Sequence, residues 1–229
     1  MELYNIIKDK NLLLDFIDWL PDLKENEKYY LSLFARRKYN KDLIKSNDKT
    51  QLKRFVSDKQ RMYDKIRQLE IPKGRWLLKL TPAPQDSLVL YILPNPRCMK
   101  KATSMLGKKC WDLSRSHNYN IIAEATSCVQ KSKSRAEFVD FDIDTKEVPI
   151  DIDWLNTRVG VNSFEVLETK GGYHILVKPA LAKEHCIRYE LPHNWHGDIY
   201  GKFKVDQSGD QMIPVPGCTQ GNFTPKFLK

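Results

Sequence analysis

Alternation of apolar and polar positions is clearest at residues 136–145, which read AEFVDFDIDT. Asp140, Asp142 and Asp144 alternate there with apolar side chains. Because successive side chains of a strand point to opposite faces, the pattern predicts a strand that presents three carboxylates on one face.

The remaining pattern predicts a chain of helices and strands in mixed order. Apolar residues at helical spacing predict helices over 3–20, 50–69, 99–115, 119–130, 149–159 and 180–189. Apolar runs and alternation predict strands over 29–37, 75–80, 88–93, 163–168, 173–178, 202–206 and 212–215. We expect an α/β fold, since both element types recur along the chain.

The charge distribution divides the chain into a basic and an acidic part. The net charge is +9, and residues 31–135 carry 24 Lys or Arg against 8 Asp or Glu. Residues 136–229 carry 10 against 14. A basic region beside acidic clusters suits a polyanion held next to a metal site, and the alternative is an ordinary lysine-rich surface.

Composition indicates a protein of the reducing cytoplasm. The sequence has no apolar run of the roughly 18 residues that span a membrane, and acidic residues interrupt its apolar N-terminal stretch, unlike a signal peptide. Its five cysteines include no closely spaced pair, which argues against a disulfide scaffold and against zinc.

Clustered carboxylates on one strand repel one another unless a cation neutralises them. Mg²⁺ or Mn²⁺ suits such a row, because these hard ions prefer carboxylate oxygens and leave positions open for phosphates. The alternative is an edge strand with a solvated acidic face.

Several basic residues are candidates for contacts with phosphate groups. Arg36, Arg37 and Lys38 end a predicted strand, and Arg54 lies in the predicted helix 50–69. Arg97 lies at a predicted strand-to-helix junction, where the helix N-terminus also favours anions.

A glycine turn and two later carboxylates complete the candidate site. Thr169-Lys170-Gly171-Gly172 forms a tight turn before a strand that carries His174; its glycines leave backbone N–H groups open to an anion, and Lys170 adds charge. Asp206 follows a short apolar stretch, and Asp210 lies in the turn after it.

In this order, the motifs resemble those of the archaeo-eukaryotic primase superfamily, the primase-polymerases. That family has an hhhDhD strand, a small-residue turn leading to an sxH strand, and a strand ending in hD. The matching segments are 138–144, 170–174 and 203–206. Segments 95–97 (NPR) and 214–221 (PVPGCTQG) are similar to stretches in primase-polymerases of phages, plasmids and CRISPR-associated loci.

The resemblance implies a mostly antiparallel, RRM-like catalytic sheet flanked by helices and an N-terminal α/β layer. Residues 1–85 would form an N-terminal helical and α/β basic region, and residues 86–229 the primase-polymerase core. The two are expected to form one compact unit.

The resemblance also implies roles for individual residues. Asp142, Asp144 and Asp206 would be the catalytic carboxylates that bind Mg²⁺ or Mn²⁺, with Asp140 and Asp210 as alternatives.

The resemblance implies contacts with the incoming nucleotide, and the charge pattern described above predicts those with DNA. The incoming dNTP or NTP would meet Thr169, Lys170, Gly171, Gly172, His174 and Arg97. Single-stranded or primed DNA would meet Arg36, Arg37, Lys38 and Arg54. The setting would be the cytoplasm of a prokaryotic or phage-infected cell.

The sequence departs from the family in three ways. It lacks the closely spaced Cys and His of the zinc module, and Ile213-Pro214-Val215 stands where many members have an arginine. It contains no Walker A pattern, so a helicase or further domains would lie outside this chain.

Two other function classes remain open. A metal-dependent nuclease also uses clustered carboxylates and basic residues, with Lys170 or His174 beside the activated water. A non-catalytic nucleic-acid-binding module would use the basic residues, and its acidic strand would be structural. Against these, a template-directed nucleotidyltransferase that works by a two-metal-ion mechanism is the preferred hypothesis.

Overall fold

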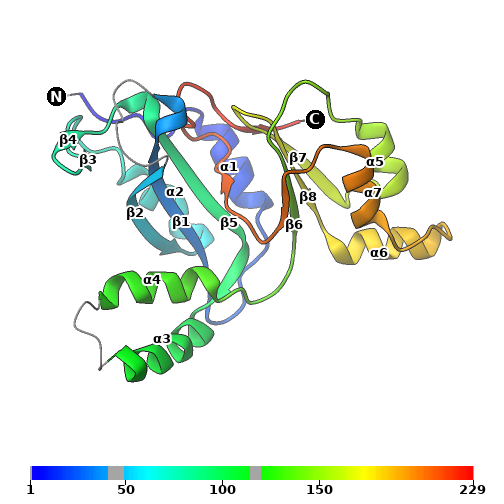
Figure 1. The fold of residues 1–229 in the computed structure, drawn as a ribbon, viewed down its shortest axis with the longest axis horizontal. Coiled ribbons are helices and arrows are strands. Elements are labelled where there is room, and N and C mark those ends of the chain that lie inside the picture. Colours follow the sequence, from blue (N-terminus) through cyan, green and yellow to red (C-terminus); the bar gives the residue numbers. More distant parts are fainter. Residues whose placement is uncertain (1, 41–48, 114–119, 229) are drawn as a thin grey trace.

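A computed structural model describes residues 2–40, 49–113 and 120–228 of the chain. It shows a mixed α/β fold built on two antiparallel sheets that stand side by side with helices around them (Figure 1). The expected α/β class with mostly antiparallel strands is thus confirmed.

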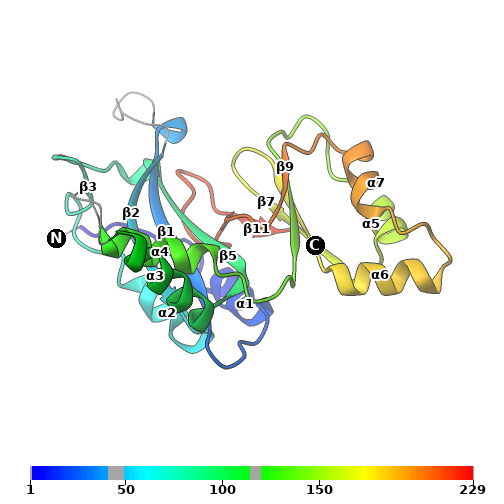
Figure 2. The ribbon, with the colours of Figure 1, turned by 60° about the horizontal axis from the view of Figure 1, so that its bottom comes forward.

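The first sheet contains β1 (Glu27–Arg36), β2 (Lys49–Ser57), β5 (Leu88–Cys98) and β10 (Ile213–Pro214), in the order β10-β5-β1-β2. Helices α1 (Lys10–Trp19) and α2 (Lys59–Arg67) pack on one of its faces. Asp9 and Asp58 cap their N-termini by accepting backbone N–H groups of the first turn. Helices α3 (Met99–Leu113) and α4 (Ile121–Lys131) pack against each other near the end of β5, as Figure 2 shows from below.

The second sheet contains β6 (Val139–Ile143), β7 (Phe164–Glu168), β8 (Tyr173–Val177), β9 (Gln207–Gly209) and β11 (Lys226–Phe227), in the order β11-β7-β8-β6-β9. Helices α5 (Ile152–Arg158), α6 (Pro179–Arg188) and α7 (Trp195–Lys202) cover one face. Phe141, Ile143, Ile175 and Val177 point to these helices. The residues that alternate with them therefore face the first sheet.

Four short elements complete the described fold. A hairpin joins β3 (Leu77–Leu78) to β4 (Thr81–Pro82), and the 3₁₀ turns are η1 (Arg37–Tyr39) and η2 (Gln85–Ser87). No helix of the described residues is both long and apolar enough to cross a membrane.

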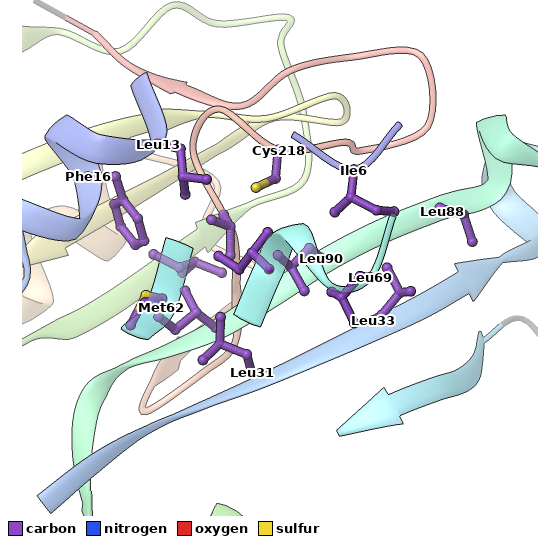
Figure 3. Close-up of a cluster of buried hydrophobic side chains, with 14 of the residues drawn as sticks. Ile6, Leu13, Phe16, Leu31, Leu33, Met62, Leu69, Leu88, Leu90 and Cys218 are labelled. Carbon is purple, nitrogen blue, oxygen red and sulfur yellow. The ribbon is translucent and has the colours of Figure 1, made fainter. Parts of the chain in front are cut away.

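A large apolar core joins the first sheet to its helices and to the second sheet (Figure 3). Leu31, Leu33 and Leu90 of the first sheet pack there with Leu13 and Met62 of the helices. The same cluster includes Phe138, Leu167, Leu176, Val215 and Cys218. Strand β1 pairs with β2 on one side and with β5 on the other, so residues from both sides of the predicted boundary after residue 85 belong to the first sheet.

The predicted helix over 50–69 is wrong in its first half. Residues 49–57 form β2, which pairs with β1 from Tyr29 to Arg36, and Asp58 then begins α2. Leu52, Phe55 and Val56 fit helical spacing within a strongly basic stretch, which hid the strand. Pairing with β1 therefore outweighed the helical spacing of the apolar residues and made this segment a strand.

The predicted strand over 202–206 is also wrong. Helix α7 runs to Lys202, and the strand that pairs with β6 is β9, placed where a turn was predicted. The sequence of α7, WHGDIYGK, contains two glycines and little apolar periodicity, so it gave no helical signal.

Candidate functional site

A cleft of about 660 Å³ lies between the facing sides of the two sheets. Asp142, Asp144 and His174 line it from the second sheet, and Arg36 and Tyr91 from the first. Residues as far apart in the sequence as Arg36 and Gln220 therefore meet around one space.

Strand β6 sets the positions of the three alternating carboxylates. Asp140 pairs in register with Leu176 of β8, and Asp142 pairs with His174. The Asp142 and Asp144 side chains are 23% and 63% exposed and line the cleft, whereas that of Asp140 is 1% exposed. The same face of the strand thus carries two accessible carboxylates and one buried carboxylate.

Asp140 holds the imidazole of His174. The Nδ1 atom of His174 lies 2.9 Å from Oδ2 of Asp140 and 3.1 Å from Oδ1, and both side chains are buried. Burial alone would lower the pKa of His174, but the carboxylate of Asp140, followed by those of Asp142 and Asp144, outweighs it and raises that pKa. Because Asp140 occupies Nδ1 of His174, the other ring nitrogen, Nε2, which lies 3.7 Å from Asp142 Oδ1, is the one left for the cleft.

Asp206 lies beside Asp142 because the chain enters β9 there. The backbone N–H of Asp206 donates to the carbonyl oxygen of Asp142 at 2.8 Å, and both side chains line the cleft. The next residue, Gln207, donates from Nε2 to Oδ2 of Asp142 at 3.2 Å. The structure thus brings Asp142, Asp144 and Asp206 to the same cleft.

Asp210 also lines the cleft, but its carboxylate is engaged. Its Oδ1 and Oδ2 accept from Nη2 and Nη1 of Arg97 at 2.6 and 2.7 Å, and Oδ1 accepts from Asn95 at 2.9 Å. Arg97 is 1% exposed and does not line the cleft, although the sequence predicted a contact with nucleotide. Of the two rivals for the third carboxylate, Asp206 is the one without such a partner in the described contacts.

The glycine turn reaches the cleft through Thr169 and Gly171. The backbone N–H of Thr169 donates to the carbonyl oxygen of Gly172 at 2.9 Å, and that of Lys170 to Oε1 of Gln220 at 2.8 Å. The Lys170 ammonium lies 4.8 Å from the centre of the Tyr39 ring, outside the cleft lining. A methyl group on Gly171 would come within 2.9 Å of Asp144 Oδ1, so this exposed carboxylate would have to move to admit it.

Gly172 packs against the end of β6, which gives a prediction. In Gly172→Ala, the added methyl group would lie 1.8 Å from the carbonyl oxygen of Ile143 and 2.7 Å from the backbone nitrogen of Thr145. Because the neighbours are backbone atoms flanking Asp144, we expect the unfolding free energy to fall by about 3 kcal/mol. Urea unfolding followed by tryptophan fluorescence measures this change.

A matched control for this prediction is Gly107→Ala in α3. A methyl group at residue 107 would meet no atom within 4 Å, so this variant should be as stable as the natural protein or slightly more stable. If Gly172→Ala unfolded at the same urea concentration as Gly107→Ala, the tight packing of the turn would be contradicted.

The basic residues of the first sheet divide into two groups. Arg36 and Lys38 line the cleft; Arg36 donates from Nη1 to the Tyr91 hydroxyl at 2.8 Å, and Lys38 Nζ lies 3.9 Å from Asp144 Oδ1. Arg37 and Arg54 do not line it. The structure therefore brings two of the four predicted nucleic-acid contacts to the carboxylates.

The carboxylates suit a hard divalent cation by their chemistry. Asp142 and Asp144 provide oxygen donors two residues apart on one strand, and Asp206 adds a third in the same cleft. Among the described residues, no three His, Cys, Asp or Glu side chains already form a group able to hold a metal. Mg²⁺ in phosphate-handling sites takes one or two carboxylates and completes its shell with phosphate oxygens and water, so the donor set fits.

Comparison with known proteins gives no match to a protein-family model, a curated protein or a solved structure.

Some cleft residues were not anticipated from the sequence. Gln207, Tyr91, Met212 and Gln130 line the cleft, and no motif singled them out. Gln220 also lines it and lies within the PVPGCTQG segment, so the proline-glycine motif was a signal for it.

Proposed function

We propose that the protein is a template-directed nucleotidyltransferase, a primase-polymerase that joins dNTPs or NTPs on single-stranded or primed DNA. One observation carries the proposal: Asp142, Asp144 and Asp206 line the same cleft as His174, the Thr169–Gly172 turn, Arg36 and Lys38. This combination supplies both the carboxylates and the positive charge that phosphoryl transfer requires.

In this proposal the carboxylates act by electrostatics and position. Asp142, Asp144 and Asp206 would hold Mg²⁺ or Mn²⁺, which supplies activation of the attacking hydroxyl and neutralisation of phosphate charge. The Gln207 amide, bonded to Asp142, fixes the orientation of that carboxylate. A Ser or Cys nucleophile is not required, because phosphoryl transfer needs in-line positioning more than a covalent intermediate.

The other side chains would hold the triphosphate. His174, oriented by Asp140, would present Nε2 to the cleft and, in its protonated form, donate to a phosphate oxygen rather than act as a general base. Thr169 and Gly171 bring the turn backbone close to the same space, and Lys38 beside Asp144 adds a cation. The second sheet would serve as the RRM-like catalytic sheet of a primase core.

Primer extension tests the proposal. A 5′-labelled primer on single-stranded DNA is incubated with the protein and Mg²⁺ or Mn²⁺, with dNTPs and NTPs in separate reactions. We expect a ladder of longer products that disappears when a chelator removes the metal. The comparison of the two nucleotide series reports the sugar preference.

Other products would point to another class. Metal-dependent shortening of the labelled strand without extension would indicate the nuclease. Binding of the DNA with neither reaction, at all metal and nucleotide conditions, would indicate a binding module and overturn the proposal.

A further inference from the structure

The cleft has two ends, which the strand registers define. Strands β5 and β6 flank it, and β5 runs about 30 Å from Leu88 to Cys98. At the Leu88 end, Leu88 pairs with Ala35, so the next residue of β1, Arg36, lies at that end together with Lys38. Asp144 Oδ1 lies 3.9 Å from Lys38 Nζ, at this same end, and β6 runs from there back toward Asn95, which bonds to Phe138.

The opposite end is formed by the C-terminal turn of α4 and the segment that follows it. Gln130 and Lys131 line the cleft there, and the Gln130 carbonyl oxygen accepts from Arg97 at 3.0 Å. The backbone of Lys133 pairs with that of Arg97 of β5 in an isolated antiparallel β-bridge. The Nζ atom of Lys101 donates to the carbonyl oxygen of Lys133 at 3.3 Å. Lys131 lines the cleft at this end, and Lys133 and Lys101 lie beside the same segment.

These lysines differ in their partners from two nearby basic residues, Arg135 and Lys109. Arg135 pairs with Glu27 and Glu137, and Lys109 pairs with Glu124. Within the described residues, no carboxylate forms an ion pair with Lys101, Lys131 or Lys133. The positive charge of these three lysines is therefore not neutralised by an ion pair with another described residue.

We propose that Lys131 and Lys133, with Lys101 beside them, bind the phosphate backbone of the DNA strand that occupies the cleft. This inference rests on the proposed function and adds a second contact surface, opposite Arg36 and Lys38. A DNA strand held at both ends would run along β6 past its carboxylates, so the two basic ends would align its backbone with the site. Lysines are point charges on flexible stems, so the contacts are independent of base sequence.

Salt dependence of DNA binding tests the inference without relying on catalysis. Fluorescence anisotropy measures the affinity for a labelled single strand of mixed sequence, without metal or nucleotide, over a series of NaCl concentrations. Each lost phosphate contact lowers the slope of log affinity against log salt by about 0.7 for single strands. For Lys131→Ala/Lys133→Ala we expect the slope to fall by about 1.4 and the affinity at 0.1 M salt to fall at least tenfold.

The matched control removes two exposed lysines elsewhere, Lys8→Ala/Lys183→Ala. It changes the net charge equally, and neither residue lines the cleft. The slope of log affinity against log salt for this control should equal that of the natural protein within error. Equal unfolding midpoints for the variants verify that folding is intact.

The outcomes separate this inference from the proposed function. If the natural protein binds the strand and both double variants show its slope, the lysine surface is overturned while the polymerase proposal stands. If the natural protein binds no single strand even at low salt, both are overturned. If only the Lys131→Ala/Lys133→Ala variant shows a smaller slope of log affinity against log salt than the natural protein, the lysine surface is supported, whatever the extension assay shows.

Discussion

Asp142→Asn is expected to lower nucleotide addition about 1000-fold while leaving the unfolding midpoint unchanged or slightly higher. Asparagine keeps the size of the side chain but removes the negative charge that a divalent cation requires. A 1000-fold loss corresponds to about 4 kcal/mol of transition-state stabilisation, the scale of charge neutralisation by a metal. Stability should not fall, because Asp142 and Asp144 lie on one strand face and repel each other.

Single-turnover primer extension and thermal unfolding of the same preparation measure the two effects. Asp144→Asn and Asp206→Asn should behave alike, and the double variant Asp142→Ala/Asp144→Ala should be inactive. Glu184→Gln on α6 is the matched control, because its exposed carboxylate lies outside the cleft. If Asp142→Asn retained most of the activity, Asp142 could not be a metal ligand, and a nuclease or polymerase site at this position would be contradicted.

The acidic strand and the glycine hairpin could be predicted because each is local. Alternation over a few residues fixes which side chains share a face, and Asp142 and Asp144 line the cleft as this rule requires. The rule cannot distinguish Asp140 from Asp142, since both share that face. Their difference arises from the neighbouring strands, which bury Asp140 against His174. A choice between them needs the packing of the whole sheet.

Residues whose partners are distant in sequence were the hardest to predict. Arg97 looked like an anion ligand at a helix start, but its partner is Asp210, which lies 113 positions later. Strand β5 continues through Pro94 and Pro96 to Cys98, past the predicted end at residue 93. Those prolines signalled a loop. The register between β5 and β1 shifts between Lys28 and Tyr30, opposite the prolines, so the strand accommodates them there.

Arg97→Ala is expected to destabilise the protein strongly. The Arg97 side chain is 1% exposed and donates two hydrogen bonds to Asp210 and one to the Gln130 carbonyl oxygen. Its removal leaves the Asp210 carboxylate without its cation, and breaking such a buried pair costs about 3 kcal/mol or more. For a chain of this size, we expect the thermal midpoint to fall by about 10 °C in calorimetry.

The network around this pair explains why activity should fall with stability. Asn95 of β5 donates to Asp210 and to the Phe138 carbonyl oxygen, and its Oδ1 accepts the N–H groups of Glu137 and Phe138. Arg97 and Asn95 therefore connect the first sheet to the start of β6 and to the residue after β9. Both strands carry or adjoin the carboxylates, so a loosened network alters the cleft itself.

Two further variants separate this positioning role from direct contact with phosphate. In Arg97→Met/Asp210→Leu, apolar side chains of similar size replace both charges, so the loss of stability should be smaller than in Arg97→Ala. Arg75→Ala, which removes an exposed arginine, should leave the midpoint unchanged. A phosphate ligand would behave differently, because its loss would raise the KM for nucleotide without moving the midpoint. If the Arg97→Ala protein were as stable as the natural one and had a raised KM for nucleotide, Arg97 would contact the substrate and would not hold the two sheets together.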